Sequence, residues 1–180
     1  MGRWRPAASA ASPYITPAGY RRLEAEAKAL WARRNAVVKH LAAAAAEGDR
    51  SENAEYIYRK KELREIDRRI AYLQRRLPTL KIVSQAPPDP ERVFFGAWVV
   101  LEDCAGQTVR FRLVGADETD SGSGHISIDS VLARALLKRR LDEEVVVSTP
   151  QGETRYLIVE VHYAFDETSA AADDTGGQED

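Results

Sequence analysis

The chain has 180 residues, of which 44% are hydrophobic and 30% charged, so it can form one or two small domains and is too short for a large multidomain enzyme. Its single cysteine, Cys104, excludes an internal disulfide and a multi-thiolate zinc site, and its three scattered histidines form no paired ligand motif. No run approaches the roughly 18 apolar residues of a membrane span, and the N-terminus lacks a signal-peptide pattern. We therefore expect a cytoplasmic protein without a membrane contact.

The net charge of −2 hides a segregation of charge along the chain. Residues 20–81 carry 16 basic and 9 acidic side chains, whereas residues 82–165 carry 8 and 13. Charge alone leaves two interpretations of the basic half open: it contacts a nucleic acid or another polyanion, or it is a solvated helical surface.

Composition divides the chain into five segments. Residues 1–13 are rich in Ala, Ser and Pro, and residues 166–180 are acidic and lack large apolar side chains, so both ends are expected to be disordered. A proline cluster, Ala86-Pro87-Pro88-Asp89-Pro90, predicts a linker over 86–92. The linker separates a first domain over 14–85 from a second over 93–165.

The first domain has helical periodicity. Thr16-Pro17 predicts a helix start, and heptad positions then alternate in steps of three and four up to Gly48 and again beyond it. The pattern predicts two long helices that fold back as an antiparallel coiled coil, with Pro78 ending or kinking the second. The predicted seam positions are Tyr20, Leu23, Ala27, Leu30, Arg34, Val37, Leu41 and Ala44, then Tyr56 and, after an interruption at Arg59, Leu63, Ile66, Ile70, Leu73, Leu77 and Leu80.

The second domain changes to the pattern of short strands. Turn sequences such as Ser121-Gly122-Ser123-Gly124 separate β-branched and aromatic runs, and only Ser130–Arg139 has helical periodicity. We expect a small antiparallel sheet with one helix, so the whole chain is α+β. The expected strands are 93–101, 109–114, 126–128, 145–148 and 155–163.

The turn between the predicted helices, residues 48–55, is rich in charge. Ser51 is a good helix cap, and Glu52 and Glu55 complement a helix dipole. Capping and turn formation therefore account for most of the polar and charged residues here. Alternatively, Asp49 and Glu52 face one point and hold a divalent cation. Two carboxylates bind Mg²⁺ weakly on their own, because Mg²⁺ requires near-octahedral oxygen coordination. Such a tip works only by completing a site that another molecule supplies.

Three long motifs resemble the Gre transcript cleavage factors, and within them the GreB type. They are GDRSENAEYIYRKKELREIDRRIAYL at 48–73, FFGAWVVLEDCAGQTVRFRLVG at 94–115 and ISIDSVLARALLKR at 126–139. The resemblance covers roughly residues 14–164, and the motifs occur in the family's order and spacing. It implies a transcription elongation factor whose second domain is FKBP-like and which is not itself an enzyme.

The resemblance also implies roles for residues. The family's hairpin enters the secondary channel of bacterial RNA polymerase that has backtracked and extruded the 3′ end of the nascent RNA. The family's two tip acids match Asp49 and Glu52, which implies that they hold the weakly bound second Mg²⁺ of the polymerase and orient the attacking water. The factor has no cofactor of its own and is expected to be a monomer. The extruded RNA is the implied ligand of a basic stripe comprising Arg59, Lys60, Lys61, Arg64 and Arg68.

Two further points concern these positions. The basic stripe can instead pair with Glu62, Glu65 and Asp67 beside it. The second domain of the family docks on the rim helices of the polymerase's largest subunit, and the motif used there matches Ile126, Asp129 and Ser130. The family usually has proline after this serine, whereas this chain has Val131, which is expected to loosen the docking loop.

Three alternative functions compete with a cleavage factor. A regulator of the same fold would occupy the channel without promoting cleavage; a missing tip acid would favour it, and both acids are present. A peptidyl-prolyl isomerase is suggested by the FKBP-like domain, but its aromatic residues fall within strand runs and fit a sheet core better. A plain coiled-coil interaction module explains the heptads but neither the acidic tip nor the second domain.

Overall fold

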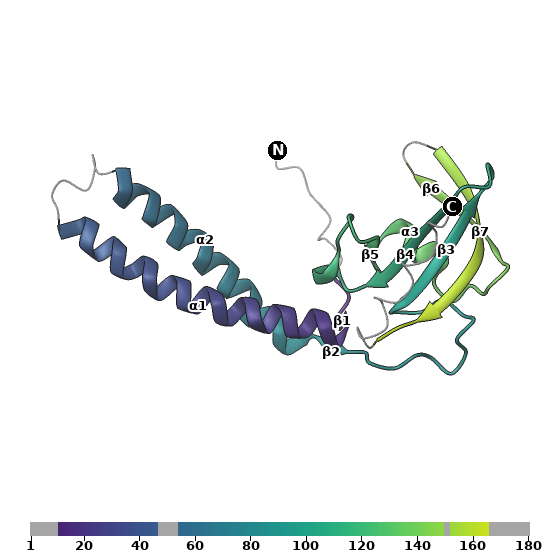
Figure 1. Ribbon diagram of the computed structural model, residues 1–180, viewed down its shortest axis with the longest axis horizontal. Helices are drawn as coiled ribbons and strands as arrows, with labels where there is room; N and C mark the ends of the chain where they lie inside the picture. The colour runs from purple at the N-terminus through teal and green to yellow at the C-terminus, as the bar shows by residue number, and fades with distance from the viewer. Residues whose placement is uncertain (1–10, 47–53, 150–151, 166–180) are drawn as a thin grey trace, which may run out of the picture. The chain divides into compact units, whose positions relative to one another are not determined.

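The computed structural model describes residues 11–46, 54–149 and 152–165. They form two compact units, of which one is Ala18–Leu80 and the other contains the described residues before and after it. Helices α1 (Pro17–Ala46) and α2 (Ala54–Arg76) form an antiparallel hairpin (Figure 1). None of the helices within the described ranges is long and apolar enough to cross a membrane.

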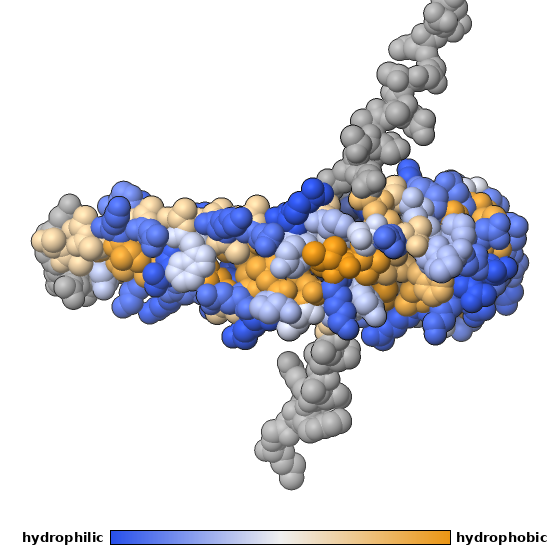
Figure 2. Space-filling view, turned by 90° about the horizontal axis from the view of Figure 1, so that it is seen from below, coloured by the Kyte–Doolittle hydropathy of each residue, from blue (hydrophilic) through white to orange (hydrophobic). Residues whose placement is uncertain are grey.

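The seam of the hairpin follows the predicted heptads. Every predicted seam position is buried or half-buried, whereas most positions between them are exposed. Val37, Ile66 and Ile70 form the centre of the contact, with Leu30 and Leu63 packed against them. On the face shown in Figure 2, hydrophilic side chains in blue alternate along the hairpin with apolar ones in tan and orange. The predicted coiled coil is therefore confirmed, and the interface is a narrow apolar stripe.

The hairpin ends where the sequence predicts. α2 ends at Arg76 and passes into a short 3₁₀ helix, η1 (Leu77–Thr79), which contains Pro78. Proline has no N–H to continue an α-helix, and the Thr79 hydroxyl instead donates to the carbonyl of Arg76 at 2.7 Å. Arg75 and Arg76 lie in the last turn of α2, where positive charge complements the helix dipole.

The second unit is built on a five-stranded sheet in the order β5-β4-β3-β7-β6. Its core contains Val99, Leu101, Leu113, Leu136 and Ile158, all fully buried. The strands are β3 (Ala97–Asp103), β4 (Thr108–Val114), β5 (His125–Ser127), β6 (Glu144–Thr149) and β7 (Gly152–Tyr163). Each observed strand overlaps one of the predicted strands, so the α+β architecture is confirmed.

Two features of this unit differ from the expectation. β5 pairs with β4 in parallel, so the sheet is mixed rather than wholly antiparallel. The connection between β4 and β5 contains the short helix η2 (Ala116–Glu118) and brings the chain back, so that β5 runs in the same direction as β4. The sequence pattern of a single strand does not reveal its direction relative to its neighbour. Helix α3 (Val131–Leu136) is also shorter than the predicted Ser130–Arg139, because Lys138 adopts a left-handed conformation (φ 69°) that ends it.

A separate two-stranded ribbon was not predicted. It consists of β1 (Tyr14–Ile15) and β2 (Lys81–Ile82), which pair in parallel. The buried Glu118 carboxylate accepts hydrogen bonds from the N–H of Thr16 at 3.0 Å and of Gly115 at 3.1 Å, and also from the Thr16 hydroxyl. These bonds fix the segment before α1 to the sheet unit.

Gly115 is required at this junction. A Cβ atom added there would lie 2.3 Å from the carbonyl oxygen of Tyr14, which is backbone and cannot move aside. The close approach of two backbone segments therefore explains a glycine directly after β4.

Candidate functional site

The predicted catalytic and metal-binding tip, Asp49 and Glu52, lies outside the described residues. The structure does describe both helices that lead to it, α1 up to Ala46 and α2 from Ala54. Glu55 lies in the first turn of α2, three residues after Glu52. The geometry next to the tip is therefore defined by the contacts of this turn.

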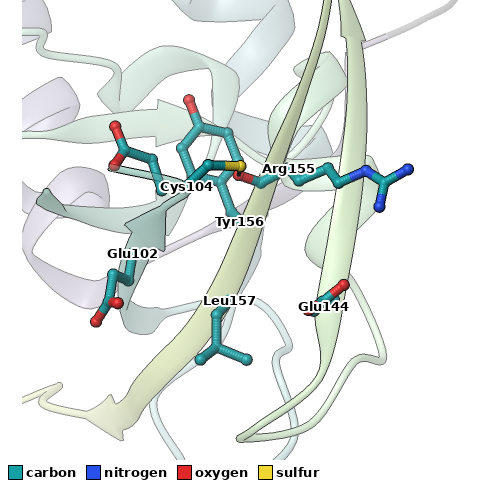
Figure 3. A pocket seen from close by; sticks show the side chains of 7 residues that line it. Glu102, Cys104, Glu144, Arg155, Tyr156 and Leu157 are labelled. Carbon is teal, nitrogen blue, oxygen red and sulfur yellow. Dashed lines mark hydrogen bonds between the residues drawn. The ribbon is translucent and has the colours of Figure 1, made fainter. Parts of the chain in front are cut away.

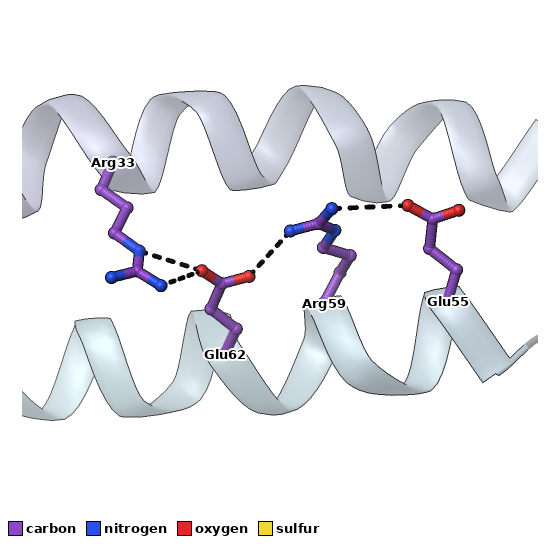
Figure 4. Close-up of polar contacts among 4 residues, drawn as sticks. All are labelled: Arg33, Glu55, Arg59 and Glu62. Carbon is purple, nitrogen blue, oxygen red and sulfur yellow. Dashed lines mark hydrogen bonds and ion pairs between the residues drawn. The ribbon is translucent and has the colours of Figure 1, made fainter.

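A chain of ion pairs connects the first turns of α2 to α1 (Figure 4). Arg59 lies 3.5 Å from the carboxylate of Glu55 and 3.2 Å from that of Glu62. Glu62 in turn accepts two hydrogen bonds from Arg33 on α1, at 2.9 and 2.7 Å. The hydrogen bond from Arg33 lowers the pKa of Glu62, and the hydrogen bond to Glu62 raises the pKa of Arg59. Both groups are therefore held in their charged forms, and the network fixes the start of α2 against α1.

Two more ion pairs cross the hairpin further from the tip. Arg34 donates to Asp67 at 2.6 Å, and Arg69 binds Glu26 through two hydrogen bonds at 2.6 and 2.8 Å. The hydrogen bond from Arg69 lowers the pKa of Glu26. Asp67 and Glu62, two acids expected as partners of the basic stripe, thus both pair with arginines of α1.

This arrangement divides the predicted basic stripe into two classes. Arg59 is half-buried and belongs to the ion-pair network, so its charge is already balanced. Lys60, Lys61, Arg64 and Arg68 are exposed, and within the described residues no ion pair joins any of them to a carboxylate. Lys60 lies over the ring of Tyr56, with 5.7 Å between its Nζ and the ring centroid. Four cations therefore remain available on the surface of α2.

The residues of the predicted docking motif lie together at the end of β5 and the start of α3. Ile126 is half-buried against the sheet core. Asp129 accepts a hydrogen bond from the Ser12 N–H at 2.8 Å, and Ser130 caps α3 by accepting one from the Ala133 N–H at 3.1 Å. Val131 is 60% exposed at the first position of α3. The contact of Asp129 with Ser12 had no signal in the sequence, because 117 residues separate the two.

The sheet unit holds a shallow cavity of about 350 Å³ between the ends of β3, β6 and β7 (Figure 3). Glu102, Glu144 and Arg155 contribute charged side chains to its lining. Phe95 is buried, and Phe111 and Tyr156 pack against the sheet core, as predicted for aromatic residues of a sheet rather than of a proline pocket. Among the described residues, no three His, Cys, Asp or Glu side chains are grouped so that they could hold a metal ion.

Comparison with known proteins identifies the family. The model of the N-terminal region of transcription elongation factors matches residues 13–82, and the model of the GreA/GreB C-terminal region matches residues 87–163. The transcription elongation factor GreB of Xanthomonas axonopodis pv. citri is 58% identical over 166 residues, which cover 91% of this chain and 99% of that protein. GreB of Pseudomonas aeruginosa is 55% identical and covers 91% of this chain and 98% of its own. The chain belongs to the Gre family of transcription elongation factors.

One solved structure, GreA factor homolog 1 of Thermus thermophilus, is 26% identical and covers 83% of this chain and 97% of its own, with a TM-score of 0.39. Within the Gre family, the curated relatives above place this chain in the GreB type. It is an accessory factor of RNA polymerase that stimulates transcript cleavage, and it is not itself an enzyme. The resemblance seen in the sequence is thereby confirmed.

Proposed function

We propose that this GreB-type factor inserts its hairpin into the secondary channel of backtracked RNA polymerase and completes the polymerase's cleavage site with Asp49 and Glu52. The observation that carries this proposal is the hairpin itself, an antiparallel pair of helices whose connecting turn contains both carboxylates. At about 1.5 Å per residue, the 23 residues of α2 extend about 35 Å, which suits a probe that reaches a buried active site.

The role proposed for the tip follows from its donor set. Two carboxylates are too few ligands to hold Mg²⁺ tightly, but they suit an ion that the polymerase already binds in part. That ion supplies stabilisation of the attacking and leaving oxygens during phosphodiester hydrolysis. Asp49 and Glu52 contribute negative charge, oxygen ligands and an acceptor that orients the attacking water. The ion-pair network from Glu55 to Arg33 holds the first turns of α2, which directly follow the tip in the sequence.

The exposed cations of α2 are proposed to bind the extruded RNA. Lys60, Lys61, Arg64 and Arg68 project from the surface without carboxylate partners among the described residues, whereas Arg59 is engaged in the network. Phosphate groups of the RNA 3′ segment are the ligands that such a surface fits. Arg59 therefore contributes by holding the helix rather than by direct contact with RNA.

The sheet unit is proposed to dock on the rim helices of the polymerase's largest subunit. Val131 and Ile126 supply apolar surface, and Asp129 and Ser130 shape the loop through their backbone hydrogen bonds. The absence of proline at position 131 leaves the first turn of α3 less constrained.

The decisive experiment follows release of 3′ fragments from stalled, backtracked elongation complexes with labelled RNA and Mg²⁺. Asp49→Asn and Glu52→Gln are each expected to lower the cleavage rate at least ~100-fold while the thermal midpoint changes little. Glu65→Gln, an exposed acid on α2, is the matched control and is expected to cleave normally. If both tip variants cleave like the wild type, the assignment of the tip is wrong. If the wild type binds polymerase without cleavage, the protein is a channel-binding regulator.

The RNA contact is tested by the dependence of cleavage on salt. Arg64→Ala and Arg68→Ala are each expected to weaken productive binding and to reduce the slope of log activity against log salt by about 0.7. Arg21→Ala, an exposed arginine on α1, is the matched control. Unchanged slopes in both stripe variants would show that these cations do not contact phosphate.

A further inference from the structure

A row of cationic and aromatic side chains crosses the sheet on the face opposite the core. Along β3, Ala97, Val99 and Leu101 are buried in the core, so Trp98 between them points to the other face. The strand registers place His125, Arg112, Trp98 and His162 side by side on β5, β4, β3 and β7. Arg110 lies two residues before Arg112 and therefore on the same face. We refer to Trp98, Arg110, Arg112, His125 and His162 as the cationic row.

The ring of Trp98 is enclosed by the other members of the row. The Arg110 guanidinium lies 4.3 Å from the ring centroid and that of Arg112 lies 5.6 Å from it. The His162 ring stacks on Trp98 at 6.3 Å, and the His125 ring meets it edge-on at 5.6 Å. Trp98 is half-buried, and the Arg110 guanidinium is the group of the row that lies closest to its ring. Arg110 is exposed and lies above this aromatic support, whereas Arg112 is buried, so Arg110 is the cation of the row that a carboxylate can reach.

The acidic groups near the row are already engaged. Arg110 Nη2 lies 3.0 Å from His162 Nε2, and a guanidinium can only donate, so Nε2 accepts and the ring proton is on Nδ1. That Nδ1 lies 2.9 Å from a carboxylate oxygen of Glu160. Asp120, beside His125, accepts hydrogen bonds from the Ser123 hydroxyl and the Gly122 N–H. Neither acid pairs with Arg110 among the described residues.

The described part of the chain ends beside this row. Arg112 Nη2 donates to the carbonyl of Ala164 at 2.6 Å, one residue before the end of the described chain. Residues 166–180 then carry six acidic and no basic side chains. Fifteen residues can span about 50 Å at most, which is enough to reach every member of the row. These residues also lie beyond the matched family region, which ends at 163.

We propose that the acidic C-terminal segment, residues 166–180, binds back onto the cationic row, with its carboxylates paired to Arg110. The exposed cations of α2 offer a competing target for the same segment. The row is favoured because the segment starts beside it, and a short connection gives a high effective concentration. The contact neutralises a basic surface of the sheet unit and does not depend on the proposed roles of the hairpin.

The test uses the full chain with a nitroxide on the C-terminal segment. Cys104→Ser removes the exposed native thiol, and Thr175→Cys carries the label. Paramagnetic loss of NMR signal is expected at the amides of Arg110 and His125 and at the Trp98 indole N–H, relative to the reduced label. The loss is expected to disappear at high salt and when the six acids are replaced by their amides, a change that leaves the sheet unit intact.

Arg110→Glu should also abolish the signal loss, whereas Arg155→Glu, an exposed arginine seven residues before His162 on β7, should retain it. Three results would overturn the proposal. They are no signal loss on the sheet, signal loss centred on Lys61 and Arg64 of α2, or a loss that neither salt nor removal of the acids changes. Unchanged shifts of core amides in each variant confirm that the fold is retained.

Discussion

The two units of the molecule differ in how they bury their apolar side chains. The sheet unit places a continuous set of apolar side chains at 0–3% exposure around Leu101, Leu113 and Ile158. The hairpin buries a single stripe centred on Val37, Ile66 and Ile70, and joins its helices by ion pairs outside that stripe. Because the interface between the helices is narrow, most of the α2 surface remains exposed and carries charged side chains. The sheet unit instead buries most of its apolar side chains in one core. The difference predicts how each unit responds to substitution.

The largest expected effect is a core truncation in the sheet unit. Leu101→Ala should lower the free energy of unfolding by about 2–5 kcal/mol, because Leu101 is fully buried and its neighbours can fill the space only in part. Leu63→Ala in the half-buried seam should cost about 1–2 kcal/mol. Denaturant unfolding followed by circular dichroism measures both.

Val109→Ala is the control for this pair, because Val109 is 40% exposed and its truncation should change stability by less than about 0.5 kcal/mol. Equal costs for Leu101→Ala and Leu63→Ala would contradict the contrast between a thick core and a thin seam.

The same contrast explains what could be predicted from sequence. The seam was predictable because helical periodicity is local, and Arg34 keeps its seam position by pairing with Asp67. Arg59, where the pattern is interrupted, is half-buried because it pairs with Glu62. The parallel pairing of β5 and the contact of Ser12 with Asp129 depend on a crossover and a distant segment, which no local pattern encodes. The cationic row was missed for the same reason, since its members come from four strands.

A smaller effect concerns the pH dependence of the hairpin. The hydrogen bond from Arg33 lowers the pKa of Glu62 in the folded protein, so the ionised Glu62 stabilises the hairpin above its unfolded pKa of about 4.5. That contribution to stability is lost as the pH falls through the lowered pKa of Glu62 in the folded protein. Glu62→Gln should destabilise the hairpin by about 0.5–1 kcal/mol at pH 7 and should weaken its further loss of stability below about pH 4.5.

Helicity at 222 nm against pH and denaturant measures this effect, with Glu65→Gln as an exposed control on the same helix. Identical acid profiles for the wild type and Glu62→Gln would show that the ion-pair network contributes nothing to the hairpin, which would then rest on its apolar seam alone.

An effect of similar size, and the only expected gain, is at the first position of α3 in the sheet unit. Ser130 already has the extended conformation that a following proline requires (φ −68°, ψ 158°), and no described hydrogen bond uses the Val131 N–H. Val131 is 60% exposed, so little packing is lost. Val131→Pro should therefore stabilise the unit by about 0.5–1 kcal/mol by restricting the unfolded chain, and should tighten polymerase binding if this loop docks there. A gain in the thermal midpoint without a gain in affinity would separate the rigidity of the loop from its role as a docking surface.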